Sequence, residues 1–156
     1  MKKIIKKILF IGLIIFLLMQ LYQTARNESF EQDITANFTK VYNVPKNVEA
    51  IVRTSCYDCH SNNTNYPWYS NVQPVGFFME HHIKEAKEDL NFDEWGKYSK
   101  RKQENKLDRI VKQIKSDEMP LASYTLIHKN ARLTTVQKEE IMDWISKIKD
   151  SISSQY

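Results

Sequence analysis

Apolar residues in the second half of the chain recur at intervals of three and four positions, the spacing that places side chains on one face of a helix. These stripes predict helices over residues 77–90 and 103–115. A last helix is expected to begin near Thr134, which forms a capping-box pattern with Gln137. The apolar positions of the last two helices are Leu107, Ile110, Val111 and Ile114, and then Ile141, Trp144, Ile145 and Ile148. The pattern therefore predicts amphipathic helices packed around a core.

A shorter stripe precedes the two cysteines. Asn47 is a plausible N-cap, so we expect a short helix from about this residue to Cys56. Its inward positions would be Val48, Ile51 and Val52. Residues 26–46 are expected to form a tether or a loosely docked segment that ends at Pro45. In this tether, Phe30, Ile34, Phe38 and Val41 are spaced to coat one helical face.

The composition favours helices over strands. Only three Gly and four Pro occur in 156 residues, which argues against a turn-rich sandwich or barrel. Residues 61–76 are rich in Asn, Ser and Pro and are expected to form a loop, although they carry aromatic side chains. We therefore predict an all-α protein with about four helices after the leader, and long loops around Cys56 and Met119.

The N-terminus has the pattern of an export signal. Four lysines precede an unbroken apolar run from Ile8 to Met19. The run is shorter than the about 20 residues of a full membrane span. A cut after Ala25 would place Gln23 where a small residue is needed, so residues 1–25 are either a signal peptide or an uncleaved anchor. We favour an anchor extending from Ile4 to Tyr22, which would place the body on the extracytoplasmic, periplasmic side of the inner membrane.

Charge argues against nucleic acid as a partner. The net charge of +4 is carried by the leader lysines, and the rest of the chain has equal numbers of acidic and basic residues. Residues 97–115 are locally basic. This stretch is either a docking face for an acidic redox partner in or near the membrane or the solvated side of a helix.

The only two cysteines of the chain lie in the segment from Cys56 to His60, which reads C-Y-D-C-H. This C-x-x-C-H arrangement is typical of covalent haem attachment. Cys56 and Cys59 would form thioether bonds to one haem c, and the imidazole of His60 would be the proximal ligand of its iron. The second ring N–H of His60 should be donated to a carbonyl or carboxylate, for which Pro74 is a candidate.

Two other interpretations of the cysteine pair have to be weighed. A thioredoxin-like redox site would need a βαβ context, which the chain does not show. A zinc site would need two further ligands, such as His81, His82 or His128, but there is no second cysteine pair and the spacing matches no zinc finger. We therefore favour haem.

The distal ligand of the iron decides much of the function. Met119 is the first candidate, because it stands before Pro120 in the loop leading to the last helix and its thioether would raise the reduction potential. His82 is the alternative, followed by His81 and His128. The aromatic side chains that could pack on the haem are Trp68, Tyr69, Phe77, Phe78 and Trp144, although each fits an ordinary helical core equally well.

These motifs resemble the small bacterial haem-binding-domain family of c-type cytochromes. The resemblance is carried by residues 56–64, which read C-Y-D-C-H-S-N-N-T, by Y-P-W-Y at 66–69 and by N-F-D-E-W at 91–95. It continues with Met119-Pro120, Ser123-Tyr124 and Ile127-His128, and so covers roughly residues 41–148. It implies a cytochrome c-like helical fold, which we place at residues 47–150, holding one haem through Cys56, Cys59 and His60, with Met119 as distal ligand.

The expected function is that of a membrane-tethered electron carrier that needs no catalytic side chain. The alternatives are a peroxidase-like haem enzyme with an open sixth position, and a haem-based redox or gas sensor. Met119 argues against the enzyme, whereas the sequence leaves the sensor open.

Overall fold

The computed structural model describes residues 1–29 and 34–153, and over these residues the chain is helical and contains no strand. The α-helices are α1 (Lys2–Met19), α2 (Phe38–Val41), α3 (Lys46–Ser55), α4 (Tyr57–His60), α5 (Val75–Asp89), α6 (Lys100–Lys115), α7 (Ala122–Ile127) and α8 (Thr135–Ser153). The 3₁₀-helices are η1 (Ile34–Ala36), η2 (Trp68–Asn71), η3 (Phe92–Lys97) and η4 (Lys129–Ala131). The predicted all-α class is confirmed.

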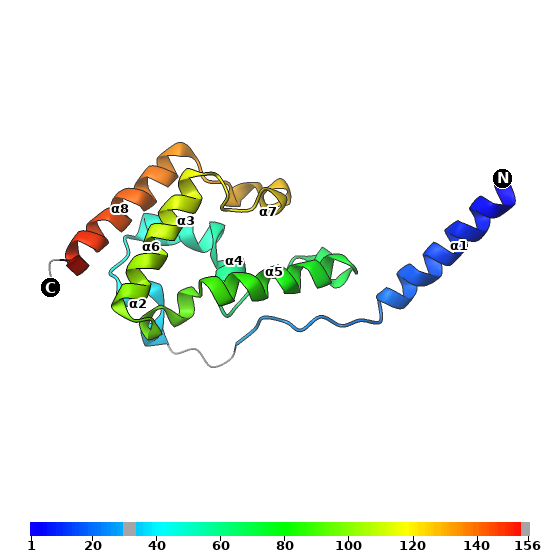
Figure 1. The fold of residues 1–156 in the computed structure, drawn as a ribbon, viewed down its shortest axis with the longest axis horizontal. Coiled ribbons are helices and arrows are strands. Elements are labelled where there is room, and N and C mark those ends of the chain that lie inside the picture. Colours follow the sequence, from blue (N-terminus) through cyan, green and yellow to red (C-terminus); the bar gives the residue numbers. More distant parts are fainter. Residues whose placement is uncertain (30–33, 154–156) are drawn as a thin grey trace.

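Helices α6 and α8 pack side by side and form one side of the core (Figure 1). Leu107 of α6 is 0% exposed, and Ile141 and Ile145 of α8 are each 1% exposed. The capping box is present, because the Gln137 amide donates to Thr134 Oγ1 and the Thr134 amide donates to Gln137 Oε1. Local periodicity therefore identified both helices and their buried faces.

The region before the cysteines differs from its prediction in two respects. Pro45, not Asn47, is the N-cap of α3, and the Asn47 side chain donates instead to Glu140 Oε2 of α8 at 2.9 Å. A proline is compatible with this position because the first helical N–H groups have no intrahelical partner. The predicted tether contributes Phe38 and Val44 to the core, while Phe30 and the side chain of Ile34 lie outside the described residues.

Short helices account for the difference between the predicted number of helices and the observed one. Residues 61–76, expected to be a loop, include η2, and α7 and η4 lie between Met119 and α8. None of these three helices is longer than six residues, which is too short to show apolar periodicity. Gly76 allows the start of α5 to approach η2, because a Cβ at this position would collide with the carbonyl oxygen of Ser70.

Helix α1 projects away from the body, and the segment after it runs along α5 (Figure 1). Gln20 and Gln73 are joined by two hydrogen bonds, at 2.9 and 3.2 Å. Among the described residues, no helix is both long enough and apolar enough to cross a membrane. The anchor expected from Ile4 to Tyr22 stays a prediction, and the helix itself ends at Met19.

Candidate functional site

The two cysteines and His60 lie at a break between two helices. Cys56 is the C-cap of α3 and the N-cap of α4, and its φ of −128° interrupts the helical path. The amides of Cys59 and His60 both donate to the carbonyl oxygen of Cys56, at 3.2 and 3.0 Å. This single turn brings both thiols and the imidazole onto one short element.

The imidazole of His60 is held by the C-terminal end of α5. Its Nδ1 lies 3.0 Å from the carbonyl oxygens of both Ala86 and Leu90. Because a carbonyl oxygen only accepts, Nδ1 carries the proton and Nε2 presents its lone pair. Burial lowers the pKa of His60, which the two backbone hydrogen bonds partly oppose, so the ring is neutral at pH 7.

The predicted acceptor for His60, the carbonyl of Pro74, is therefore wrong. Pro74 is the N-cap of α5, whereas the observed acceptors lie at the opposite end of the helix. The twelve residues from Pro74 to Ala86 span about 18 Å of helix. The carbonyl of Leu90, the C-cap of α5, has no partner within the helix, and the Ala86 carbonyl, which accepts from the Leu90 backbone amide at 2.8 Å, uses its second lone pair for the His60 ring.

The thiols are unsuited to disulfide exchange. Burial raises the pKa of Cys56 to about 12 and that of Cys59 to about 11, so both are protonated thiols at pH 7. A thioredoxin-like site needs a lowered thiol pKa. Within residues 1–29 and 34–153, no group of three or more His, Cys, Asp or Glu side chains could hold a metal ion, which gives the zinc interpretation no support.

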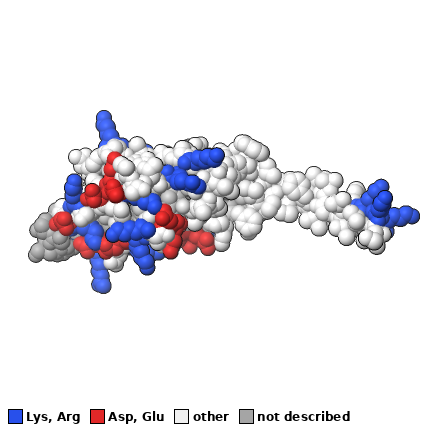
Figure 2. Space-filling model, turned by 90° about the horizontal axis from the view of Figure 1, so that it is seen from above, with Lys and Arg blue, Asp and Glu red and all other residues white. Residues whose placement is uncertain are grey.

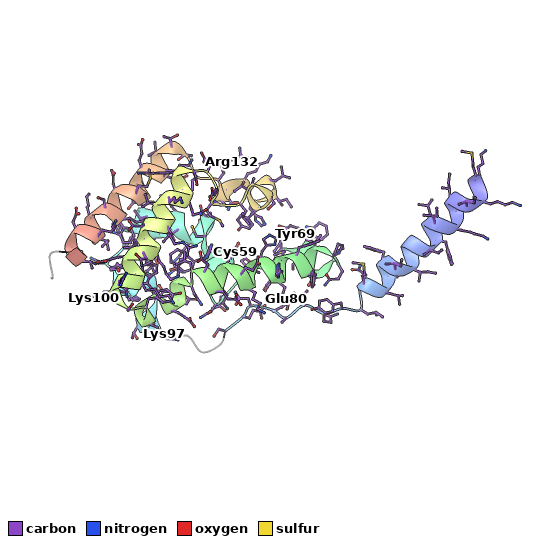
Figure 3. All side chains as sticks on the ribbon, in the orientation of Figure 1. Cys59, Tyr69, Glu80, Lys97, Lys100 and Arg132 are labelled. Carbon is purple, nitrogen blue, oxygen red and sulfur yellow. The ribbon has the colours of Figure 1, made fainter. Side chains whose placement is uncertain are left out.

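Both cysteines and His60 face a largely apolar cleft between α5 and α7, which consists of three adjoining lobes. The inner lobe, of about 140 Å³, is lined by Cys56, His60, Phe92, Ile110, Ile114, Met119 and Leu133 among others. The central lobe, of about 300 Å³, includes Cys56, Cys59, His60, His82, Met119 and Tyr124. The outer lobe, of about 260 Å³, includes Cys59, Tyr69, Phe78, Met79, His82, Tyr124 and Ile127. Figure 3 shows Cys59 and Tyr69 on the α7 side of α5, and Glu80 on the other side.

Met119 is placed by the end of α6. Asp117 has a φ of 58°, the Glu118 amide donates to the carbonyl of Gln113 and the Asp117 amide to that of Ile114. These are the two hydrogen bonds of a Schellman motif, which ends the helix and turns the chain. Met119 consequently lines the inner and central lobes together with His60.

The histidine candidates for the distal position are dispersed. His82 lines the central and outer lobes, and its Nδ1 lies 2.7 Å from the Phe78 carbonyl of its own helix. His81 instead pairs with Glu85 at 3.2 Å. His128 Nε2 lies 2.6 Å from the hydroxyl of Tyr69. The structure thus brings Met119 and His82 to the cleft, and only Met119 of these two shares both lobes with His60.

The predicted haem-packing aromatics have different surroundings. Tyr69 and Phe78 line the outer lobe. Trp144 packs in the helical core, with its ring centroid 5.4 Å from that of Phe38. Trp68 is 79% exposed, so its packing against a haem stays a prediction.

A buried polar network holds residues 56–64, which we call the attachment loop, and the sequence did not predict this network. Asp93 is 8% exposed. Its carboxylate accepts hydrogen bonds from the backbone N–H of Asn62 at 2.7 Å and from the side-chain amide of Asn37 at 2.6 Å. Asn91 donates to the Asn62 side chain at 2.8 Å. Asn91 and Asp93 alternate with the apolar residues Leu90, Phe92 and Trp95, and this placement of polar residues is the signal that could have identified them.

Asn27 joins the same loop from the N-terminal segment. Its side chain donates to the Ser61 carbonyl at 2.8 Å and to Thr64 Oγ1 at 2.9 Å, and its amide donates to the Tyr66 hydroxyl at 2.7 Å. Thr64 in turn donates to the carbonyl of Asp58. No local pattern marks Asn27, because every one of these partners lies more than 30 residues away.

Two hydrogen bonds tie α7 to the attachment side of the cleft. The Tyr124 hydroxyl donates to Asp58 Oδ2 at 2.6 Å, and Tyr69 and His128 form the second bond. The rings of Tyr124 and His128 stack with centroids 4.3 Å apart. Asp58 is one of the two residues between the cysteines, so the segment of residues 119–128, which carries Met119, is connected directly to the C-x-x-C-H motif.

The residues present fit a haem group. Two thiols, a neutral imidazole with its Nε2 lone pair available and a thioether line the same apolar cleft. Such a cleft matches a large flat cofactor whose iron takes one nitrogen and one sulfur ligand.

Comparisons with known proteins agree with this geometry. A family model described as a haem-binding domain matches residues 14–147 of the chain. A search of curated proteins and a search of solved structures each gave no match.

Proposed function

Because the chain belongs to the haem-binding domain family, we propose that it is a mono-haem c-type cytochrome that carries electrons on the extracytoplasmic side of a membrane. The observation that carries the proposal is the meeting of two thiols, the His60 imidazole and the Met119 thioether on one cleft. Bound haem would supply an iron that cycles between the ferrous and ferric states.

The chain's own residues would act by holding and orienting the group. Cys56 and Cys59 supply the thiols for covalent attachment, and the Ala86 and Leu90 carbonyls hold the His60 ring in one tautomer and one orientation. Met119 would be the distal ligand. The largely apolar lining would limit the access of water to the bound group, which would favour the less charged reduced state.

The proposed location rests on α1. Its lysines followed by apolar residues are typical of an export segment, and covalent haem attachment to C-x-x-C-H proteins takes place outside the cytoplasm. The redox partner would be a protein in or near the membrane. Of the basic stretch 97–115, Arg109 pairs with Asp89 at 2.5 Å and Lys97 with Glu94 at 3.7 Å, so part of its charge is internally balanced.

The first experiment tests covalent attachment in protein produced with its N-terminal segment. We expect haem stain to persist on a denaturing gel and the intact mass to include one porphyrin. Replacing both cysteines (Cys56→Ser with Cys59→Ser) should abolish the stain, whereas Thr54→Ala, an exposed change on α3, should leave it unchanged. Free thiols without added porphyrin mass would overturn the proposal.

The second experiment identifies the distal ligand and separates the carrier from an enzyme or sensor. Met119→Ala should remove the ferric methionine–iron charge-transfer band, while Met79→Ala, which lies in the outer lobe, should retain it. His82→Ala and His81→Ala form a second matched pair, and neither should alter the band. A high-spin iron in the unmodified protein would contradict the carrier and favour a peroxidase or sensor.

A further inference from the structure

Three separate stretches of the chain contain no charged side chain. No Asp, Glu, Lys or Arg occurs in residues 8–25, 59–79 or 119–128, although 27% of the residues in the whole chain are charged. In the structure these stretches are most of α1 with the segment after it, the region from Cys59 into the first turns of α5, and the distal loop with α7. An uncharged run of this length is unexpected in a chain so rich in charge.

The three stretches meet at one end of the body. Gln20 bonds with Gln73, and the rings of Tyr22 and Phe77 lie 6.2 Å apart. Ile127 of α7 lines the outer lobe of the cleft together with residues from the start of α5. Figure 2 shows the result, because the part of the body nearest α1 is white while the Lys, Arg, Asp and Glu side chains gather at the other end and at the α1 tip.

This neutral end, defined here as Tyr22, Trp68, Phe77, Phe78, Leu126 and Ile127, is also apolar and exposed. Trp68 is 79% exposed, Leu126 is 72% and Ile127 is 61%. Phe77 and Phe78 are exposed by half or more of their surface. A cluster of large apolar side chains that faces water marks an interaction surface.

Helix α1 indicates what covers this surface. Its large apolar side chains from Ile4 to Leu18 are all at least 42% exposed, so the body covers none of them. From Ile8 to Met19 the helix has no polar side chain and is therefore apolar on every side. A groove on one protein partner covers only one side of such a helix, whereas lipid supplies an apolar medium around it. The neutral end is continuous with α1 through Tyr22, and it carries the Trp and Tyr side chains that favour membrane interfaces.

We propose that the neutral end docks on a lipid bilayer, with Trp68, Phe77 and Leu126 inserted at the boundary between headgroups and acyl chains. The outer lobe beside Cys59 would then open toward the lipid, and the charged end with Lys97 and Lys100 would face the aqueous side (Figure 3). The inference rests on the proposed placement at a membrane but does not depend on haem.

Trp68 provides a direct probe in the full chain, because Trp95 and Trp144 are only 0% and 8% exposed. Vesicles of phosphatidylcholine and phosphatidylglycerol with brominated acyl chains should quench Trp68 emission relative to unbrominated vesicles. The ratio of Trp68 emission with brominated vesicles to that with unbrominated vesicles removes any constant quenching by haem. Trp68→Phe should abolish the lipid-dependent quenching while the protein still sediments with the vesicles.

Two further surface variants test whether other apolar side chains of the neutral end also enter the lipid. Phe77→Ser combined with Leu126→Ser should raise the lipid concentration needed for half-maximal quenching of Trp68 by about tenfold, because two apolar side chains no longer enter the lipid. Val136→Ser on α8, an equally exposed apolar side chain at 62%, should change nothing.

The outcomes separate the docking from the membrane placement itself. Sedimentation of the chain with vesicles without quenching of Trp68 would overturn the docking and leave the tether standing. Failure to sediment would overturn both. A dimer that shields Trp68 from acrylamide without vesicles, and that is lost in the double variant, would also overturn the docking and assign the surface to a second copy of the chain.

Discussion

The two walls of the cleft are held by different kinds of contact. The attachment wall, residues 56–64, rests on buried polar groups, with Ser61 at 2%, Asn91 at 3% and Asp93 at 8% exposure. The distal wall, residues 119–128, is joined to it by the hydrogen bond from Tyr124 to Asp58 and is tied to η2 by the bond between His128 and Tyr69, and much of its outer surface is exposed. The comparison indicates that the fold fixes the position of the thiols and His60, while the position of Met119, the proposed distal ligand, depends on a few contacts.

Physical chemistry explains why the two walls should respond differently to mutation. A buried carboxylate that satisfies two donors leaves both unpaired when it is removed, and each unpaired group carries a desolvation cost. A partly exposed hydroxyl can be replaced by water when it is lost. We therefore expect stability to depend mainly on the attachment wall and ligation to depend mainly on the distal wall.

The largest effect should come from Asp93→Ala. The change leaves the backbone N–H of Asn62 and the side-chain amide of Asn37 without their acceptor, which should lower the free energy of unfolding by about 3 kcal/mol. Urea denaturation of the purified protein measures this cost. Asp93→Asn keeps one acceptor oxygen and should cost about half as much.

The control for this change is the neighbouring Glu94→Ala. Glu94 is 43% exposed at its side chain and pairs with Lys97 at 3.7 Å, so its loss should cost no more than about 0.5 kcal/mol. Equal costs at Asp93 and Glu94 would show that the buried network does not support the attachment wall.

A smaller effect on stability is expected from Tyr124→Phe. The variant loses the 2.6 Å hydrogen bond to Asp58, which should cost about 1.5 kcal/mol in urea denaturation. In the haem-loaded protein, the methionine–iron charge-transfer band should weaken because Met119 is less well positioned. Tyr22→Phe, at an exposed ring, is the matched control and should change neither measurement.

The smallest effect is the coupling between the two bonds of the distal wall. Tyr69→Phe and Tyr124→Phe should not be additive, because both bonds hold α7 and the stacked rings of Tyr124 and His128 connect them. We expect an interaction energy of about 0.5 to 1 kcal/mol in a double-mutant cycle. Strict additivity would mean that the distal wall is not held as one unit.

The sequence by itself determined the helical class, the faces of α6 and α8, the capping box at Thr134 and the C-x-x-C-H turn. Each of these depends on residues within a few positions of one another, so periodicity and spacing suffice to predict them. Met119 was also found locally, from its place before Pro120, although its role as a ligand stays a prediction.

Only the tertiary structure decided which groups complete the site. The acceptors of His60 are Ala86 and Leu90 instead of Pro74, and Asn27 and Asp93 hold the attachment loop from either side of it in the chain. These partners lie 26 or more residues from the groups they contact. Hydrogen bonds over such separations depend on how whole helices pack, and no local pattern of side chains records that packing.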